Sequence, residues 1–434
     1  MRSRSLLAAL SLAAVAVVTA AHPSVGQSTE QSPAGGKSDQ RHCPQLSKKL
    51  KWYGDNRDKL QKVIDERGLC GKNAGNRTHP RPVAAFDWDN TVTKNDITDS
   101  TIAWALEHDK ILRPKSWKST SKWMTRAAHR ALTEACGTDV PVGKPLPTSK
   151  NVECTDEILE IRHDAQTMDG EPAFEGKWDY RRTKPNYAWV PQLFAGHTPA
   201  EVTAYAAKAR KEVLAAPVGE EKTVGTHTIH GYVRYYKQVK DLIATLQKAG
   251  FEVYVVSAGS EPVTEAWTPG VGVDADHTIA IRSVLKNGRI TTRTEGCGDM
   301  PDSKGEAIPY IDGKRCWINK DVYGIKGADA WERQDWKHTI ALGGGDADTD
   351  VTFVNDATGA HLVLNRNQNE IMCRGYDNAD GRWVVNPMFI EPLERKETFY
   401  PCSSAAYINP NGALSPVQRP DGSVVPDQAD RIHG

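Results

Sequence analysis

Two aspartates that lie two residues apart, in the run Asp87-Trp88-Asp89-Asn90-Thr91, are the strongest chemical signal in this sequence. Side chains at this spacing lie on the same side of an extended chain, so both carboxylates can face one site while Trp88 points away. Phosphoryl transfer needs an in-line nucleophile, a proton donor for the leaving oxygen and positive charge against the phosphoryl oxygens. Asp87 can be the nucleophile, Asp89 can move the proton, and Thr91 can orient the phosphoryl oxygens.

The elements that lead into polar residues predict a parallel sheet. The apolar run that ends at Asp87 has no helical period, which is typical of a strand buried on both faces. A helical pattern that ends at Gly250 is followed by an apolar run that ends at Ser257, and helix, glycine and strand repeat in a doubly wound α/β fold. Ligands bind at the carboxyl ends of such strands. The expected strands are 82–87, 251–257, 337–342 and 361–364.

These motifs resemble the haloacid dehalogenase superfamily, whose first signature is DxDx(T/V) and whose other signatures can be placed here in the same order. The resemblance implies that Ser257, in VYVVSAG, binds the transferring phosphate, and that Asp346 and Asp350 form the GDxxxD motif. It implies Mg²⁺ as the cofactor, bound by Asp87, Asp346 and the main-chain carbonyl of Asp89, with Asp350 supporting a metal-bound water or the lysine. Dehalogenases of the superfamily lack the second aspartate, so a phosphatase is expected.

The third signature of this superfamily is a lysine that offsets charge between the nucleophile and the phosphate. A Gly-Lys pair ending at Lys314 resembles the form found in the phosphoserine phosphatase-like branch, so Lys314 is the first choice. Lys320 is the second and Lys326 the third. The turn signal Asn287-Gly288 predicts a β-hairpin, which members of that branch carry at a similar place.

The acidic loop has a second interpretation, because DADTD at 346–350 has the spacing of the first ligands of an EF-hand calcium loop. The sixth position is Val351 rather than glycine, and the twelfth is Ala357 rather than glutamate. Calcium binding is therefore disfavoured against Mg²⁺.

A long insertion at 96–230 is expected to form a mostly helical cap over the site. Its clearest helix begins after Thr198 with a capping box and runs to Ala216. Trp88 and aromatic residues of the cap can hold a quaternary ammonium by cation–π attraction. Asn90 before the motif threonine resembles exported phosphocholine phosphatases, which makes phosphocholine a candidate beside phosphoserine. The cap aromatics considered are Trp104, Tyr187 and Trp189.

The N-terminus and the cysteines point to export. A basic start followed by the apolar stretch Leu6 to Ala21 predicts a cleaved signal peptide rather than a membrane anchor. Eight cysteines without a CxxC motif indicate disulfides rather than zinc in an exported chain, with free thiols as the alternative for any pair. Nearest-neighbour pairing is expected because each bridge then closes a local loop. The pairs are Cys43 with Cys70, Cys136 with Cys154, Cys297 with Cys316, and Cys373 with Cys402.

Charge and composition exclude some functions. Lys and Arg number 55, as do Asp and Glu, so no net charge attracts nucleic acid or anionic lipid. The C-terminal residues after about Pro401 lack periodicity and are expected to be extended or partly disordered. The expected organisation is a signal peptide (1–21), a polar linker (22–42), a helical N-terminal extension (43–81), an α/β core (82–95 and 231–400), the helical cap (96–230) and a tail (401–434).

Two functions fit these patterns. The first is a secreted, Mg²⁺-dependent phosphomonoester hydrolase that forms an aspartyl-phosphate on Asp87 and acts on a small phosphorylated metabolite. The alternative is a non-catalytic protein of the same fold that binds a metal ion and an interaction partner. The joint presence of Asp87 and Asp89 favours the enzyme, because a binding protein has no physical need for both. The sequence leaves the natural substrate and the oligomeric state open.

Overall fold

The computed structural model describes residues 42–434 except 76–79 and 305–306. The expected signal peptide and nearly all of the expected polar linker lie outside the described residues.

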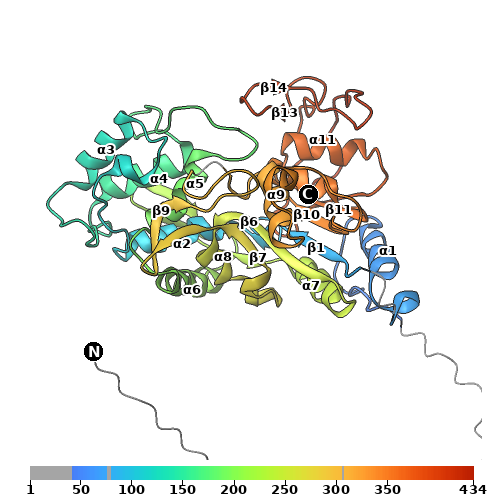
Figure 1. The fold of residues 1–434 in the computed structure, drawn as a ribbon. Helices are drawn as coiled ribbons and strands as arrows, with labels where there is room; N and C mark the ends of the chain where they lie inside the picture. Colours follow the sequence, from blue (N-terminus) through green and yellow to red (C-terminus); the bar gives the residue numbers. More distant parts are fainter. Residues whose placement is uncertain (1–41, 76–79, 305–306) are drawn as a thin grey trace, which may run out of the picture. The chain divides into compact units, whose positions relative to one another are not determined.

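Six parallel strands form the central sheet, in the order β12-β11-β10-β1-β6-β7 (Figure 1). The middle strand β1 pairs with β10 on one side and β6 on the other, with Phe86 opposite Gly344 and Val255. The residues that follow these three strands therefore leave the sheet at one edge. The strands are β1 (Val83–Phe86), β6 (Glu252–Ser260), β7 (Thr278–Ile281), β10 (Leu342–Gly345), β11 (Ala360–Asn365) and β12 (Trp383–Pro387).

Helices cover both faces of this sheet, which confirms the doubly wound α/β prediction. Ala84 and Phe86 pack in one hydrophobic cluster with α1 and α7, because alternate residues of a strand point to opposite faces. Val83 and Ala85 pack in a second cluster with α9, α10 and α11. The helices are α1 (Asn56–Arg67), α7 (Lys237–Lys248), α8 (Glu261–Glu265), α9 (Asp312–Asp321), α10 (Val351–Asp356) and α11 (Asn369–Asp377).

One predicted strand is misplaced. The apolar run 337–342 was expected to be the strand, but β10 begins only at Leu342 and continues through the glycines. These glycines allow close packing: a Cβ on Gly343 would lie 2.9 Å from the Cα of Val354, and one on Gly344 would lie 2.6 Å from Cδ1 of Phe86. The run of glycines therefore belongs to the buried sheet rather than to a loop after it.

The cap leaves and rejoins the core at adjacent points, because β2 pairs antiparallel with β5. The insertion between them is mostly helical, as predicted, and the predicted capping box of Thr198 and Glu201 opens α6. The cap helices are α2 (Ile97–Glu107), α3 (Arg126–Cys136), α4 (Val152–Asp164), α5 (Pro185–Leu193) and α6 (Pro199–Ala215). The short strands are β2 (Thr93–Lys94), β3 (Glu221–Val224), β4 (His227–His230) and β5 (Arg234–Tyr235).

The hairpin predicted at Asn287-Gly288 is present as β8 (Ser283–Lys286) and β9 (Arg289–Thr294). Both turn residues have positive φ, 52° and 73°. Ile290 of β9 accepts a hydrogen bond from Gly196 N and donates one to His197 O, at 2.9 and 2.8 Å. The hairpin thus joins the core to the cap.

The four disulfides join nearest neighbours, as predicted. The last of them ties Cys402 to Cys373 of α11, and Val417 and Val425 are buried beyond it. The tail is therefore not disordered: residues 401–434 pack on the core in a mostly extended form and include β13 (Tyr407–Ile408) and β14 (Leu414–Ser415). Disulfides of this number suggest an oxidising extracellular or periplasmic compartment.

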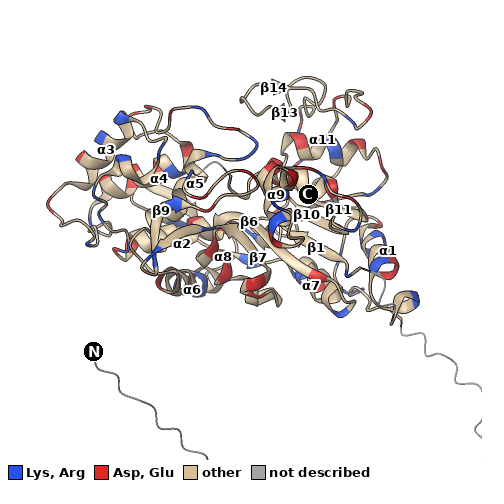
Figure 2. Ribbon diagram, viewed as in Figure 1, with Lys and Arg blue, Asp and Glu red and all other residues tan. Residues whose placement is uncertain are grey.

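Charge is evenly mixed along the described elements, with Lys and Arg interspersed with Asp and Glu (Figure 2). Within the described part of the chain, no helix has the length and apolarity that crossing a membrane requires.

We expect Gly344→Ala to lower the free energy of unfolding by about 1–3 kcal/mol, because its Cβ overpacks against Phe86. Chemical denaturation measures this, and Phe86→Leu is the matched partner. The added methyl should cost less in the Phe86→Leu background than in the wild-type background. A Gly344→Ala protein as stable as wild type would contradict the packing argument.

Candidate active site

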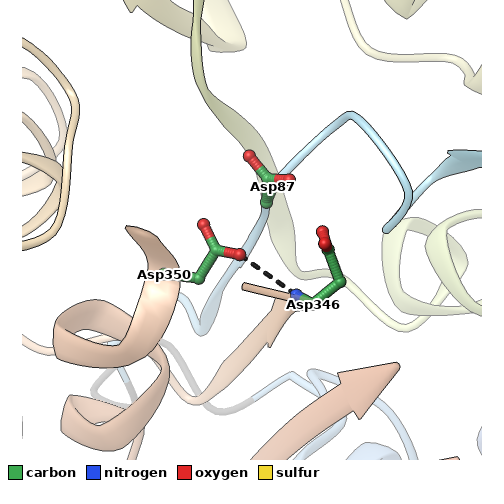
Figure 3. Close-up of side chains that lie close together, drawn as sticks. All are labelled: Asp87, Asp346 and Asp350. Carbon is green, nitrogen blue, oxygen red and sulfur yellow. Dashed lines mark hydrogen bonds between the residues drawn. The ribbon is translucent and has the colours of Figure 1, made fainter. Parts of the chain in front are cut away.

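Three buried carboxylates meet at the carboxyl edge of the sheet (Figure 3). Asp87 follows β1, Asp346 follows β10, and Asp350 ends the short 3₁₀ helix Asp348–Asp350. One oxygen from each carboxylate lies within 4.8 Å of the others. The main-chain N–H of Asp346 donates to Asp350 Oδ2 at 3.0 Å, the contact dashed in Figure 3. The parallel sheet thus brings together acids that are far apart in the sequence.

The fully buried ammonium of Lys314 lies between two of these acids. Its Nζ is 2.5 Å from Asp87 Oδ1 and 2.6 Å from Asp350 Oδ1. Burial alone would lower the pKa of Lys314, but the carboxylates of Asp350 and Asp87 raise that pKa above its usual value. The lysine is therefore charged and offsets part of the negative charge of the cluster.

Lys320, the second choice, has no contact with the three acids. Nζ of Lys320 donates to Gly296 O at 2.9 Å and lies 4.1 Å from the ring centroid of Trp317. The two lysines are six residues apart on α9, which separates them by about 9 Å along the helix axis. Lys326, the third choice, is exposed beyond the end of this helix.

The two aspartates of the first motif have different surroundings. Burial and the nearby Asp350 raise the pKa of Asp87 well above its usual value, while Lys314 opposes this shift. Asp89 faces the cavity, and its Oδ1 accepts a hydrogen bond from Ile97 N at 2.8 Å. Burial and the neighbouring Asp96 raise the pKa of Asp89 well above its usual value. A carboxyl group that keeps its proton is suited to donate it to a leaving group.

Two hydroxyls were assigned to phosphate binding. Thr91 is fully buried, and its hydroxyl donates to Asp346 Oδ1 at 2.6 Å, so it orients a carboxylate and does not line the cavity. Ser257 lies near the carboxyl end of β6, where its oxygen accepts a hydrogen bond from Gly259 N at 3.1 Å. Its side chain is buried and, like that of Thr91, does not line the cavity.

Trp88 does not line the cavity, which corrects its assignment to substrate binding. The side chain is fully buried in the core, where its ring meets Tyr235 edge to face at 6.1 Å. The physical reason is the alternation of the extended chain, which points Trp88 away from the side shared by Asp87 and Asp89.

A cavity of about 370 Å³ opens above the acids, between the sheet edge and the cap. Most of the residues that line it are polar. The core side supplies Asp87, Asp89, Asn90, Asn95, Ala258, Gly259, Asp346, Ala347, Thr349 and Arg366, and the cap supplies Asp96, Thr98, Asp99, Arg162, His163, Lys184, Tyr187 and His230.

Arg366 is a site residue that the sequence reasoning missed. It follows β11 directly, and its Nη1 donates to Asp346 Oδ2 at 2.7 Å. The signal was available, because the apolar run 361–364 was predicted to be a strand of the same sheet. A polar residue after its carboxyl end was therefore due at the same edge.

Two cations of the cap wall keep unused binding capacity. Arg162 forms an ion pair with Asp99 at 3.1 Å, yet its buried Nε has no hydrogen-bond partner. Lys184 has no hydrogen bond or ion pair within the described ranges, and burial and the adjacent Arg162 lower its pKa. Sequence reasoning missed both, since no motif marks a lone cation of an insertion.

The expected aromatic cage is absent from the lining of this cavity. Tyr187 alone of the four proposed aromatics lines it, and its ring is already flanked by Arg162 at 5.0 Å and Lys184 at 5.2 Å. Trp104 stacks on His108 at 4.0 Å, and Trp189 donates to Thr120 Oγ1 at 2.9 Å inside the cap.

The acidic loop can hold a metal ion, but not as an EF-hand. Helix α10 begins at Val351, so the residues that would complete a calcium loop are helical. Both oxygens of Asp350 are engaged, Oδ1 by Lys314 and Oδ2 by two main-chain N–H groups. Both oxygens of Asp346 are engaged as well, Oδ1 by Thr91 and Oδ2 by Arg366. The three buried carboxylates together offer the oxygen donors that a hard cation such as Mg²⁺ prefers.

No family model matches this chain, and no curated protein matches it. A conserved protein of unknown function from Anaerococcus prevotii DSM 20548 is 17% identical, with a TM-score of 0.51 over 78% of this chain and 93% of that one. A protein of unknown function from Bordetella pertussis Tohama I is 19% identical, with a TM-score of 0.40 over 71% and 100%. A substrate-bound phosphoserine phosphatase is 14% identical, with a TM-score of 0.29 over 65% and 86%.

The similarity to the Anaerococcus protein is a similarity of fold alone. The order of the parallel strands, the helical insertion after β1 and the acids at the carboxyl edge belong to a doubly wound α/β fold, and the Anaerococcus protein is similar to it in fold.

We expect the stability of Asp96→Asn, measured against that of wild type, to be higher at pH 7.5 than at pH 4.5. Burial and Asp99 raise the pKa of Asp96 to about 6, against about 3.9 in an unfolded chain. The stabilisation due to this raised pKa is present below about pH 4 and is lost as the pH rises through about 6. Asparagine keeps the oxygen that accepts hydrogen bonds from Thr98 N and Asp99 N.

The relative gain should be about 1–3 kcal/mol, measured by chemical denaturation of both proteins at the two pH values. A difference in stability between them that does not change with pH would show that Asp96 does not titrate in this range.

Proposed function

We propose that this chain is a Mg²⁺-dependent phosphomonoester hydrolase that acts through an aspartyl-phosphate on Asp87. The observation that carries the proposal is the buried Lys314 between Asp87 and Asp350 at the floor of a polar cavity. One oxygen of Asp87 is held by the ammonium, and the other, which has only a long contact of 3.4 Å with Thr91 Oγ1, is the one that attacks. A protein that only binds a metal ion has no need for a lysine ammonium against one of its carboxylates.

In the proposed reaction, Asp87 Oδ2 attacks phosphorus while the bond from phosphorus to the leaving oxygen breaks. Asp89 donates its proton to that oxygen, which departs as the alcohol. Asp89 then accepts a proton from a water molecule, the water oxygen attacks phosphorus, and the bond to Asp87 breaks to release inorganic phosphate. Lys314 offsets the charge on Asp87. Mg²⁺ bound by Asp87 and Asp346 would supply further positive charge against the phosphoryl oxygens.

The cavity favours a phosphoserine-type substrate over phosphocholine. A quaternary ammonium would need open aromatic faces, whereas the single aromatic ring in the lining lies against two cations. The free ammonium of Lys184 and the free Nε of Arg162 instead suit an acidic group on the leaving alcohol. Asp96 and Asp99 in the same wall can accept hydrogen bonds from an amino group.

Export is part of this proposal. The apolar stretch Leu6 to Ala21 and the four disulfides support secretion or transfer to a periplasm. The proposed partner is a small phosphomonoester substrate. Nucleic acid is not proposed as a partner, and no stable membrane anchor is proposed for the protein.

Wild-type protein should release phosphate from p-nitrophenyl phosphate when Mg²⁺ is present and lose this activity with a chelator. Asp87→Asn should lower kcat by about 10⁴-fold or more, because it removes the nucleophile. The control is Asp58→Asn on α1, whose side chain is 78% exposed and far from the chemistry in sequence and role. Full activity in Asp87→Asn would end the assignment.

The alternative, a non-catalytic metal-binding protein of this fold, is separated by beryllofluoride, which mimics an aspartyl-phosphate. With Mg²⁺ it should raise the Tm of wild type and leave Asp87→Asn unchanged. Mg²⁺ binding without turnover and without this shift would favour the alternative.

Lys184→Met should raise the KM for phosphoserine by about 10-fold, because one charged hydrogen bond to the substrate is lost. The KM for p-nitrophenyl phosphate should change less than twofold. The matched control is Lys208→Met, an exposed cap lysine beside Trp104. Steady-state kinetics on phosphoserine, phosphocholine and phosphoethanolamine measure the effect. Equal changes for all substrates, or a preference for phosphocholine, would refute the role given to Lys184.

A further inference from the structure

A cap residue, Arg181, is buried in the core and is not part of the cavity lining. It lies in the segment between α4 and α5, and its side chain is 4% exposed. Its guanidinium reaches the core helices α9, α10 and α11 rather than its own cap helices. Burying a guanidinium costs free energy unless partners surround it, so the arrangement needs a physical explanation.

The guanidinium is part of a closed ring of hydrogen bonds. Arg181 Nε donates to Asp312 Oδ2 at 3.0 Å, and its Nη2 donates to Thr352 Oγ1 at 3.2 Å. The hydroxyl of Thr352 donates in turn to Asp312 Oδ1 at 2.6 Å. Three side chains from three separate segments therefore fix one another.

The two partners in this ring flank the charged pair of the active site. Asp312 is the first residue of α9, two residues before Lys314. Thr352 is in the first turn of α10, two residues after Asp350. One guanidinium thus joins the beginning of α9, which carries Lys314, to the beginning of α10, which Asp350 directly precedes. Lys314 Nζ and Asp350 Oδ1 are 2.6 Å apart.

Main-chain hydrogen bonds also join the cap segment around Arg181 to the beginning of α9. Asp312 N donates to Arg181 O at 2.8 Å, and Ile308 N donates to Arg182 O at 3.0 Å. Gly313 permits the tight turn that leads into α9, because a Cβ there would lie 1.9 Å from Ile308 O and 3.4 Å from Arg182 O. The start of α9 is therefore pressed against the cap segment and cannot shift alone.

Other contacts neutralise Arg181. Nη1 donates to Glu370 Oε2 at 2.9 Å and to Ile408 O at 3.1 Å, and the guanidinium lies 4.2 Å from the ring centroid of Tyr407. Glu370 also pairs with Arg374 at 3.0 Å, so it keeps a cationic partner when Arg181 is replaced. A variant at Arg181 thus leaves Glu370 paired, which favours folding.

We infer that Arg181 is a positioning residue for the reaction at Asp87: through Asp312 and Thr352, the cap fixes the separation of Lys314 and Asp350. The inference rests on the proposed phosphatase function. A small displacement of a catalytic group lowers the rate strongly while substrate binding persists. The effect of removing Arg181 should therefore fall on kcat rather than on KM.

The test compares Arg181→Met with Arg182→Met in the full chain. Arg182 is the adjacent residue, but its guanidinium pairs with Asp179 at 3.3 Å and lies 3.9 Å from the ring centroid of Trp331. With p-nitrophenyl phosphate and Mg²⁺, Arg181→Met should lower kcat by about 10- to 100-fold and keep KM within about twofold. Arg182→Met should keep both constants within about twofold, and Arg181→Lys should recover part of the loss.

A double-mutant cycle separates positioning from general support of the fold. In a Lys314→Arg background, Arg181→Met should add less than about a twofold loss, because the ammonium it positions is already gone. Independent multiplication of the two losses would overturn the inference, as would wild-type kcat in Arg181→Met or a loss that only follows the folded fraction. If Arg181→Met does not fold, Thr352→Val decides: an unchanged kcat overturns the inference.

Failure of the two proposals is distinguishable. A wild-type protein without phosphatase activity refutes the proposed function. An active wild type with an unaffected Arg181→Met refutes the positioning role alone.

Discussion

The contact on which the site depends is the ammonium of Lys314 between Asp87 and Asp350. Three buried carboxylates with oxygens within 4.8 Å repel one another, and burial strengthens the repulsion because little water screens it. A single cation at 2.5 and 2.6 Å from two of them offsets this cost. Arg366 and Thr91 do the same for Asp346, one by charge and one by a hydrogen bond. Each acid therefore has a fixed partner before any ligand binds.

The sheet makes this contact available by bringing distant segments to one edge. Asp87 follows β1 and Asp346 follows β10, and these two strands are adjacent in the sheet. Thr91 therefore reaches Asp346 across 255 positions of sequence. The close packing of β10 depends on glycine, since side chains there would strike Phe86 and the backbone of α10. The same edge receives Arg366 from β11 and Ser257 from β6.

The cap has two physical roles in this view. Its inner wall lines the cavity with cations and acids, which would contact the leaving group in the proposed reaction. Its segment at 179–183 enters the core, where Arg181 links the beginnings of α9 and α10. The C-terminal tail adds to the second role through Ile408 and Tyr407, which contact the same guanidinium. Residues of the core and of the tail thus both contact the buried guanidinium of the cap residue Arg181.

The sequence by itself determined what depends on local pattern. It predicted the doubly wound sheet, the capping box of α6, the hairpin at Asn287-Gly288 and the four disulfides, because apolar period, turn residues and loop closure act over short ranges. It also identified the acids of the site, since strand-terminal carboxylates share an edge in a parallel sheet. The start of β10 was misplaced because glycines carry no apolar signal, and their burial follows from packing alone.

Only the tertiary structure decided which charges meet. Lys314 and Lys320 are equal candidates by residue type, and the direction in which each leaves α9 separates them. Trp88 has the right type for substrate binding, but the core on its side of the strand removes it from the cavity. Arg162, Lys184 and Arg181 carry no motif, because their partners come from segments that only the folded chain brings near. Pairing of buried charges is a long-range property, and local sequence pattern does not encode it.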